Sequence, residues 1–377
     1  MNKILRLYKK KDKILDFLFY LLATFTLLDY GISSLLISLL LLLNLIVNGI
    51  KVSLIWFFGL YFIYLLLISI YFSGFEDSVS RLSSSFLLFF IPVFLSSFKI
   101  DMKKLKNFAK IYVFSILLKS LICLLLLFFD KKFIQGGSIP LLNVDVHGTF
   151  FSYEIMIAIL LVYHLIQNKY KIIALVFLSL IIILFQKKIA LFILALFWVF
   201  HMRKNKQYLT LTIISLGTLF VFYKTSYLEK IRLLINTSLN FNLVGEDRVR
   251  IRLFKAGWQN FMEAPILGKG AVKHTLFYSE YNLTNLGAWA QNYNTHNYFL
   301  FVLCSGGILA FLFFLSPYAY FIIKTFKKSK PFFIFLIITL IFNLTESLLD
   351  RYNGVITFSI FCLFFYEHYL KKENHKI

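Results

Sequence analysis

The apolar residues of this chain come in repeated blocks that are long enough to cross a lipid bilayer. The stretches 53–72, 108–129 and 298–323 are examples, and about 20 apolar residues suffice for a helix to span the hydrocarbon. Inside lipid every backbone polar group must be hydrogen-bonded within the protein, so such blocks have to be helical. Only 15% of the residues are charged, whereas soluble domains contain about a quarter. The sequence therefore predicts an all-α polytopic membrane protein.

The spacing of these blocks predicts about twelve transmembrane helices and one large exterior loop. No small-x-small cleavage site precedes Asp29, so we interpret the first block as a retained helix and not as a signal peptide. The predicted organisation is helices one to nine in 1–223, the loop in 224–296, and helices ten to twelve with a cytoplasmic tail in 297–377. The predicted helices cover 14–28, 32–47, 53–72, 82–98, 108–128, 149–167, 172–185, 189–201, 208–223, 297–323, 331–348 and 354–369.

A formal net charge of +22 would suggest a nucleic-acid partner in a soluble protein. Here most Lys and Arg residues lie in short runs between apolar blocks, which is the pattern of cytoplasmic connections in membrane proteins. The pattern predicts that both termini are cytoplasmic, and it argues against nucleic acid. The basic segments are 1–13, Lys51, 99–106, 168–171, 203–206, 324–330 and 371–376.

Two predicted exterior stretches carry positive charge against this rule, and they are therefore candidates for function. The first is the turn that contains Lys187 and Lys188. The second is the segment 224–295, which is too polar to span and is rich in Arg, Lys and aromatic residues. Long loops cross the membrane whatever their charge, but the basic excess still needs a reason. The cysteines Cys123, Cys304 and Cys362 show no metal or disulfide spacing and are predicted to be packing residues.

Within the exterior segment, residues 247–263 predict an amphipathic helix that lies on the bundle and stops at Pro265. A guanidinium group is a rigid fork that matches phosphate oxygens, so a cluster of such groups suits a lipid diphosphate. Contact with anionic lipid headgroups is an equal alternative. The positive charges of this segment are Arg248, Arg250, Arg252 and Lys255.

His296 and Asn297 open the next predicted helix. A histidine titrates near neutrality, so at the outer mouth of a helix it can take a proton from an acceptor hydroxyl. Capping or packing of the helix is the alternative role.

A third group of candidates follows predicted helix eleven, where Glu346, Asp350 and Arg351 lie close in sequence. Ionisable residues at membrane depth are costly and are therefore functional candidates, although Arg351 paired with Glu346 or Asp350 would also be a structural ion pair. Glu154 is a similar candidate whose partner the sequence does not identify.

In order and spacing, these residues resemble the O-antigen ligase and O-antigen polymerase superfamily of bacterial envelope glycosyltransferases. The resemblance rests mainly on the pattern Arg250-x3-Phe254-x-Ala-Gly-x3-Phe261-x3-Pro265-x2-Gly268-x-Gly270, followed by His296-Asn297 and Gly306-Gly307. The spacing to Pro265 favours Arg250 as the family arginine, and Arg248 is the alternative.

Two further pieces of the chain are similar to the family pattern. Lys188-x-Ala190-Leu191 is similar to its Arg-containing turn, and Glu346 with Arg351 resembles its carboxy-terminal acidic and basic pair. Lys188 keeps the charge of the expected arginine but loses the bidentate fork, which predicts looser contact with phosphate.

The resemblance implies a GT-C-like fold in the bacterial inner membrane, with a large periplasmic loop that contains short helices and an active site that faces the periplasm. It implies transfer of a glycan from an undecaprenyl diphosphate carrier, without metal, cofactor or nucleotide sugar. The implied partners are that donor, lipid A core or a growing glycan as acceptor, and membrane lipids. In the implied site His296 is the general base or orients the acceptor, and Arg250 is the main diphosphate contact. Arg248, Lys188 and Arg351 also bind the diphosphate, and Asn297, Glu346 and Asp350 are supporting residues.

The favoured interpretation is an O-antigen ligase that acts on lipid A core, and the alternative is a polymerase that joins repeat units on the carrier. A flippase for lipid-linked oligosaccharides is a third hypothesis from a different class. It predicts cations that line a cavity inside the bundle, whereas Lys119 is the only Lys or Arg placed well inside a predicted span. A purely structural scaffold would not explain the arginine cluster.

Overall fold

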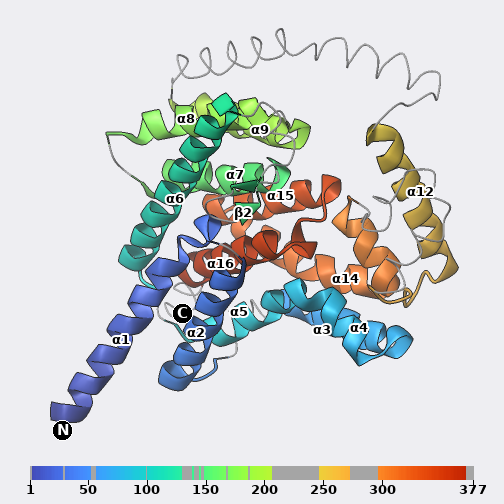
Figure 1. Ribbon diagram of the computed structural model, residues 1–377, viewed down its shortest axis with the longest axis horizontal. Helices are drawn as coiled ribbons and strands as arrows, with labels where there is room; N and C mark the ends of the chain where they lie inside the picture. Colours follow the sequence, from blue (N-terminus) through green and yellow to red (C-terminus); the bar gives the residue numbers. More distant parts are fainter. Residues whose placement is uncertain are drawn as a thin grey trace.

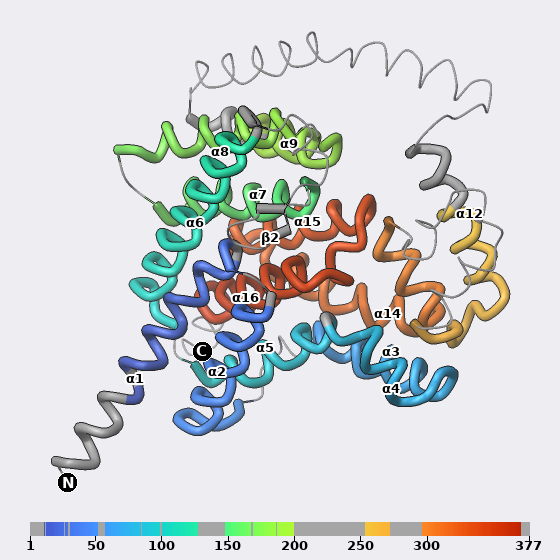
Figure 2. Tube along the Cα trace, in the orientation of Figure 1, coloured from blue at the N-terminus to red at the C-terminus, as the bar shows by residue number. Residues whose placement is uncertain are grey.

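The computed structural model describes most of the chain as a bundle of helices (Figures 1 and 2). Elements named below lie within the ranges that it describes. These are residues 2–28, 30–51, 57–98, 100–129, 138–139, 144–145, 148–166, 169–185, 187–205, 246–271 and 296–370.

The helices agree with the apolar blocks at most positions. Helices α2, α7, α8, α14, α15 and α16 begin and end within a few residues of the predicted bounds, and α9 extends a few residues beyond its predicted end. Helix α3 is described from Phe57, and residues 53–56 of its predicted range lie outside the described residues. The described elements are α1 (Asn2–Leu22), η1 (Phe25–Leu27), α2 (Tyr30–Asn48), α3 (Phe57–Ser73), α4 (Phe75–Leu82), η3 (Ser83–Phe86), α5 (Leu87–Leu95), α6 (Met102–Phe129), β1 (Ser138–Ile139), β2 (Val144–Asp145), α7 (Gly148–Leu165), α8 (Lys171–Phe185), α9 (Lys188–Asn205), α12 (Glu246–Glu263), α14 (Tyr298–Phe326), α15 (Lys330–Thr345), η7 (Leu348–Asp350) and α16 (Tyr352–Tyr369).

Helix α16 lies in the middle of the bundle, with α15 beside it, α7 to α9 above, α2, α3 and α5 below, and α12 at the right edge of the view (Figure 1). Its side chains are buried from Gly354 to Glu367. Aromatic rings pack around it, for example Phe335 stacked on Phe358 with centroids 5.9 Å apart. The polar residues Thr357, Ser359 and Glu367 of α16 are therefore packed against protein.

Four helices within the described ranges are long and apolar enough to cross a membrane. They are contained in α2, α6, α7 and α14, and four shorter apolar helices, in α3, α8, α9 and α15, accompany them. A polytopic membrane protein is consistent with this content. The twelve crossings and the orientation of the termini stay predictions, and the predicted helix 208–223 lies outside the described residues.

The predicted single helix 82–98 is wrong, because the chain there forms α4, η3 and α5. The axes of α4 and α5 differ by 73°. The break falls on the serine run 83–85, where short hydroxyl side chains compete for backbone hydrogen bonds and weaken a helix. The arrangement is either a broken span or a re-entrant loop, and it turns Arg81 toward the protein interior.

Other departures are smaller. The first helix runs from Asn2 to Leu22 and not from 14 to 28, because Lys and Arg are good helix formers and extend it through the basic segment. Helix α6 begins at Met102, where the Asp101 side chain accepts a hydrogen bond from the backbone N–H of Lys104 at 2.7 Å. The all-α prediction also missed the two-residue strands β1 and β2, which pair antiparallel.

The partner of Glu154 is Lys119. Nζ of Lys119 on α6 lies 3.1 Å from Oε2 of Glu154 on α7, and both side chains are 2% exposed. The ammonium group also lies 4.7 Å from the centroid of the Phe151 ring. Because each charge neutralises the other, this pair fastens α6 to α7 and leaves no net charge in the bundle at this point.

Candidate functional site

The candidate site begins at the amino end of α14. Asn297 is the capping residue, because its Oδ1 accepts a hydrogen bond from the backbone N–H of Leu300 at 3.0 Å. His296 precedes the cap with φ of +47°, a left-handed conformation that is uncommon outside glycine. Asn297 therefore has the capping role that was the alternative for His296, and the histidine side chain is directed elsewhere.

His296 contacts Glu346, the residue that follows α15. Nδ1 of His296 and Oε2 of Glu346 lie 3.1 Å apart, and the side chains are 25% and 6% exposed. An ionised carboxylate only accepts hydrogen bonds, so Nδ1 is the donor. In the neutral ring this leaves Nε2 as the nitrogen that can accept a proton. The structure thus joins two sequence candidates that are 50 residues apart.

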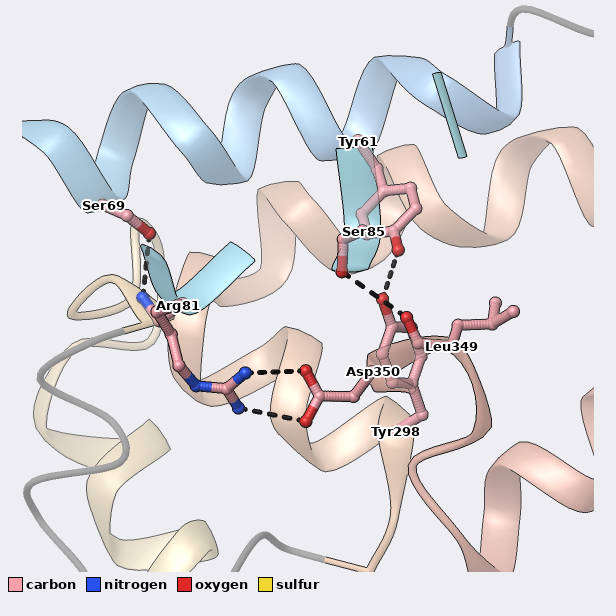
Figure 3. A network of polar contacts seen from close by, with 8 residues as sticks. Tyr61, Ser69, Arg81, Ser85, Tyr298, Leu349 and Asp350 are labelled. Atoms are coloured by element: carbon pink, nitrogen blue, oxygen red, sulfur yellow. Dashed lines mark hydrogen bonds and ion pairs between the residues drawn. The ribbon is translucent and has the colours of Figure 1, made fainter. Parts of the chain in front are cut away.

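Asp350 is held by Arg81, a residue that sequence reasoning missed. Nη1 and Nη2 of Arg81 donate to the two carboxylate oxygens of Asp350 at 2.9 and 3.0 Å (Figure 3). The guanidinium carbon lies 5.2 Å from the centroid of the Phe301 ring on α14. Asp350 and Glu346 therefore have Arg81 and His296 as partners, whereas the sequence had offered Arg351 as a possible partner of either acid. A signal did exist in the sequence, since Arg81 is the only Lys or Arg between the predicted helices 53–72 and 82–98.

Further polar contacts surround this ion pair (Figure 3). The hydroxyl groups of Tyr61 on α3 and Tyr298 on α14 are hydrogen-bonded to each other. The Ser85 hydroxyl donates to the carbonyl oxygen of Leu349 at 3.5 Å. The backbone N–H of Ala271 donates to Ser69 Oγ at 2.9 Å. These bonds connect the amino-terminal elements α3 and η3 with α14, η7 and the segment after α12, which lie about 200 residues or more further along the chain.

Helix α14 is interrupted at Gly307, where φ is +66° and ψ is −164°. This region of backbone space is open essentially to glycine alone. In a regular helix the N–H groups of Ile308 and Leu309 would bond the carbonyls of Cys304 and Ser305. The interruption leaves these four backbone groups without their helical partners, and at membrane depth such groups must be bonded elsewhere.

The segment that follows α12 supplies all four partners. The N–H groups of Lys269 and Gly270 donate to the carbonyls of Cys304 and Ser305 at 3.1 and 2.8 Å. In return, Ile308 and Leu309 donate to the carbonyls of 265 and 266 at 2.8 and 3.4 Å. The chains approach so closely that a Cβ on Gly268 would lie 2.4 Å from the backbone nitrogen of Gly306. We call this set of contacts the 265–270 junction. It gives a physical reason for the spacing of the proline and glycines in the pattern.

The predicted amphipathic helix at residues 247–263 is confirmed as α12, and small residues form its contact with α14. Ala256 and Gly257 are buried against α14, where Cys304 Sγ donates to the Gly257 carbonyl at 2.9 Å. Small residues allow this close approach. The larger apolar residues Phe254, Trp258 and Met262 are about half exposed, at 48%, 48% and 59%.

Of the predicted diphosphate-binding cations, the structure describes the side chains of some and not of others. Arg248 and Arg250 lie in the first turns of α12, and their side chains fall outside what the structure describes. Arg351 is exposed beside Asp350, at the start of α16. Lys188 is exposed at the start of α9. The turn before Lys188 lies against α7, because a Cβ on Gly148 would be 2.6 Å from Cε of Lys187.

In the part of the chain that the structure describes, no group of three or more His, Cys, Asp or Glu residues is arranged to hold a metal ion.

Comparison with known proteins gives one family. Residues 173–315 match the family model described as O-antigen ligase. The matched stretch starts in α8 and ends in α14, so it includes Lys188, Arg248, Arg250 and His296, whereas Arg81 and the segment 346–351 lie outside it. The search of curated proteins returned no match. The match supports the O-antigen ligase and polymerase superfamily, in agreement with the resemblance found in the sequence.

Proposed function

We propose that this chain acts as an enzyme of the O-antigen ligase and polymerase superfamily, and that it transfers a polysaccharide from undecaprenyl diphosphate to an acceptor hydroxyl on the periplasmic face of the inner membrane. The favoured acceptor is lipid A core, which makes the protein an O-antigen ligase. The observation that carries the proposal is the His296–Glu346 contact at the start of α14. The 265–270 junction ties that helix to α12, which carries Arg248 and Arg250.

The reaction needs a base and a cationic site. Nε2 of His296 accepts the proton of the acceptor hydroxyl while the acceptor oxygen forms a bond to the anomeric carbon of the donor. The bond from that carbon to the diphosphate oxygen breaks, and undecaprenyl diphosphate leaves with the electron pair. Glu346 holds the histidine ring by Nδ1.

Charge develops on the leaving diphosphate, so positive groups nearby stabilise the transition state more than the bound donor. We assign Arg250 as the main contact because of its spacing to Pro265, with Arg248 beside it. Arg351 and Lys188 are exposed cations at the starts of α16 and α9 and are assigned as additional contacts.

The flippase hypothesis is less well supported. It required cations that line an interior cavity, but the interior cation Lys119 is neutralised by Glu154 and is 2% exposed.

The site is tested by His296→Ala and Arg250→Ala, with Lys255→Ala as the matched control. Lys255 is an exposed cation on the same helix. Transfer is measured with purified protein and a lipid-diphosphate-linked glycan. We expect His296→Ala to lower kcat by about 10²- to 10⁴-fold, the usual contribution of a general base, and Arg250→Ala to abolish detectable transfer. Lys255→Ala should stay close to wild type. Full activity of both site variants would refute the site.

The choice between ligase and polymerase is tested by deletion of the gene in the host. Loss of a ligase leaves long glycan chains on the lipid carrier, whereas loss of a polymerase leaves acceptors capped with a single repeat unit. The second result would replace the ligase by the polymerase and would leave the proposed chemistry unchanged.

A further inference from the structure

We propose that Arg81 is a positioning residue of the transfer site, which holds the turn 346–351 in the conformation that brings Glu346 to His296. The role in catalysis rests on the proposed function, whereas the role in holding the turn rests on the structure alone. Arg81 contacts neither His296 nor Glu346 in the described contacts, and it acts through Asp350.

The turn 346–351 carries two acidic side chains that point to different partners. Glu346 reaches His296 and Asp350 reaches Arg81, and both carboxylates are nearly buried, at 6% and 5% exposed. Between them the backbone N–H of Asp350 donates to the Ser347 carbonyl at 3.1 Å. Because the span between the acids is short, a shift of Asp350 moves Glu346 with it.

Arg81 is suited to hold the turn because its contact with Asp350 is bidentate. Two parallel N–H···O bonds fix orientation as well as distance, which a lysine cannot reproduce. The backbone around Asp350 is held on other sides too, since Leu349 donates its N–H to Asn343 Oδ1 at 3.4 Å and accepts from Ser85. Residues of α4, η3 and α15 thus hold the turn in one conformation.

The same arginine also contacts the helix that carries the histidine. Its guanidinium group lies over the Phe301 ring, about one turn into α14. Tyr298, in the first turn of α14, is hydrogen-bonded to Tyr61 on α3. Arg81 therefore contacts both α14 and the turn 346–351, the two segments that have to meet for His296 to contact Glu346.

Direct binding of the donor diphosphate by Arg81 is the competing role. Both terminal nitrogens already donate to Asp350, so the charge of Arg81 is neutralised within the protein. The neighbouring Arg351 is the exposed guanidinium of this segment. The two roles predict different kinetics: a positioning residue changes kcat, and a diphosphate ligand changes the KM for the donor.

The first experiment measures amide hydrogen exchange of the purified protein. Arg81→Lys keeps the charge but loses the bidentate contact, and Arg81→Gln with Asp350→Asn replaces the ion pair by a neutral hydrogen-bonded pair if the single variant fails to fold. Lys104→Ala, which removes the ion pair between Lys104 and Asp16 that joins α6 to α1, is the matched control. We expect exchange in 346–351 and 296–300 to rise about tenfold in the Arg81 variants and to be unchanged in the control.

The second experiment measures transfer by the same variants. For Arg81→Lys we expect kcat to fall about tenfold while the donor KM changes by less than about twofold. A raised donor KM without a change in exchange would show that Arg81 binds the diphosphate and would overturn the proposal. Unchanged exchange and unchanged kcat would overturn it as well.

The two experiments separate this inference from the proposed function. If the wild-type protein transfers no glycan, the proposed function fails, but the exchange data still decide whether Arg81 holds the turn. If transfer occurs and exchange is unchanged in the Arg81 variants, the positioning role fails and the proposed function stands.

Discussion

The 265–270 junction holds α14 at its interruption and the turn 346–351 holds the segment where α14 starts, and the two use different parts of the chain. At the junction, four backbone hydrogen bonds replace those lost at the interruption of α14. At the turn, the contacts are made by charged side chains, Arg81 with Asp350 and His296 with Glu346. The junction has a sequence signature of proline and glycines, whereas the turn has none beyond isolated charges.

The difference has a physical cause. A backbone-to-backbone contact requires special φ values and the absence of Cβ atoms at fixed positions, and only glycine provides both. An ion pair requires only that two side chains meet in space, and their positions in sequence are unrestricted. A substitution at a backbone junction should therefore be poorly tolerated. The effect of a substitution at an ion pair should depend on whether it leaves the partner's charge unpaired.

The largest effect is expected for Gly307→Ala at the junction. A Cβ at this position would lie 2.2 Å from the Ile266 carbonyl oxygen, and φ is +66°. The backbone cannot move away without breaking the junction. We therefore expect the free energy of unfolding to fall by more than about 4 kcal/mol, a value that marks a specific structural defect. The measurement is the yield and thermal unfolding of protein extracted from membranes.

Gly49→Ala is the matched control for this substitution. Gly49 has the same φ of +66°, but a methyl group added there would meet nothing within 4 Å. The free energy of unfolding of this variant should fall only by the cost of placing an alanine in the left-handed conformation, about 1–2 kcal/mol. Equal losses at the two glycines would mean that the close approach at the junction contributes nothing.

A large effect is also expected at the buried pair of Lys119 and Glu154. Lys119→Met leaves the carboxylate buried and unpaired, which costs about 3–5 kcal/mol. The double variant Lys119→Met with Glu154→Met removes both charges and should be close to wild type in stability. Denaturation in detergent compares the three proteins. A double variant as unstable as the single one would show that the pair contributes more than mutual neutralisation.

At the turn, Glu346→Ala should affect the reaction more than the fold. Loss of the contact with Nδ1 of His296 frees the ring to rotate, and we expect kcat to fall about 10- to 100-fold, part of the general-base contribution. Glu346→Gln keeps an acceptor oxygen and should lose less. Glu263→Ala, which removes a more exposed ion pair with Lys269, is the control and should retain activity. If the two alanine variants have equal kcat, the role of Glu346 in orienting His296 is excluded.

The smallest effect is expected for Cys304→Ala. Its thiol donates to the Gly257 carbonyl and adds one side-chain contact to a junction made otherwise of backbone. Loss of this hydrogen bond should lower the free energy of unfolding by about 1 kcal/mol or less, in addition to the effect of removing the buried sulfur atom. Cys362→Ala, at another buried cysteine, measures the cost of the sulfur alone, and thermal unfolding of both variants gives the difference. A larger difference would mean that the thiol contact is a main part of the junction.

Much of the fold could be predicted from the sequence, because apolar blocks in lipid have only the helix available to them. Helix α12 and its end before Pro265 were predicted from apolar spacing and from the proline and glycines. The side of α12 that packs was not predicted, because Ala256 and Gly257 bury little apolar area yet allow the closest approach. The break between α4 and α5 was missed, since the serines there are compatible with a helix.

Composition and local spacing were enough to predict a helical membrane protein, the segments of greatest interest and His296 as a candidate base. The partners were found only in the folded chain: Glu346 for His296, Arg81 for Asp350 and Lys119 for Glu154. Arg81 and Asp350 are 269 residues apart. No local pattern encodes such a contact, because its strength depends on how the helices bring the charges together and exclude water.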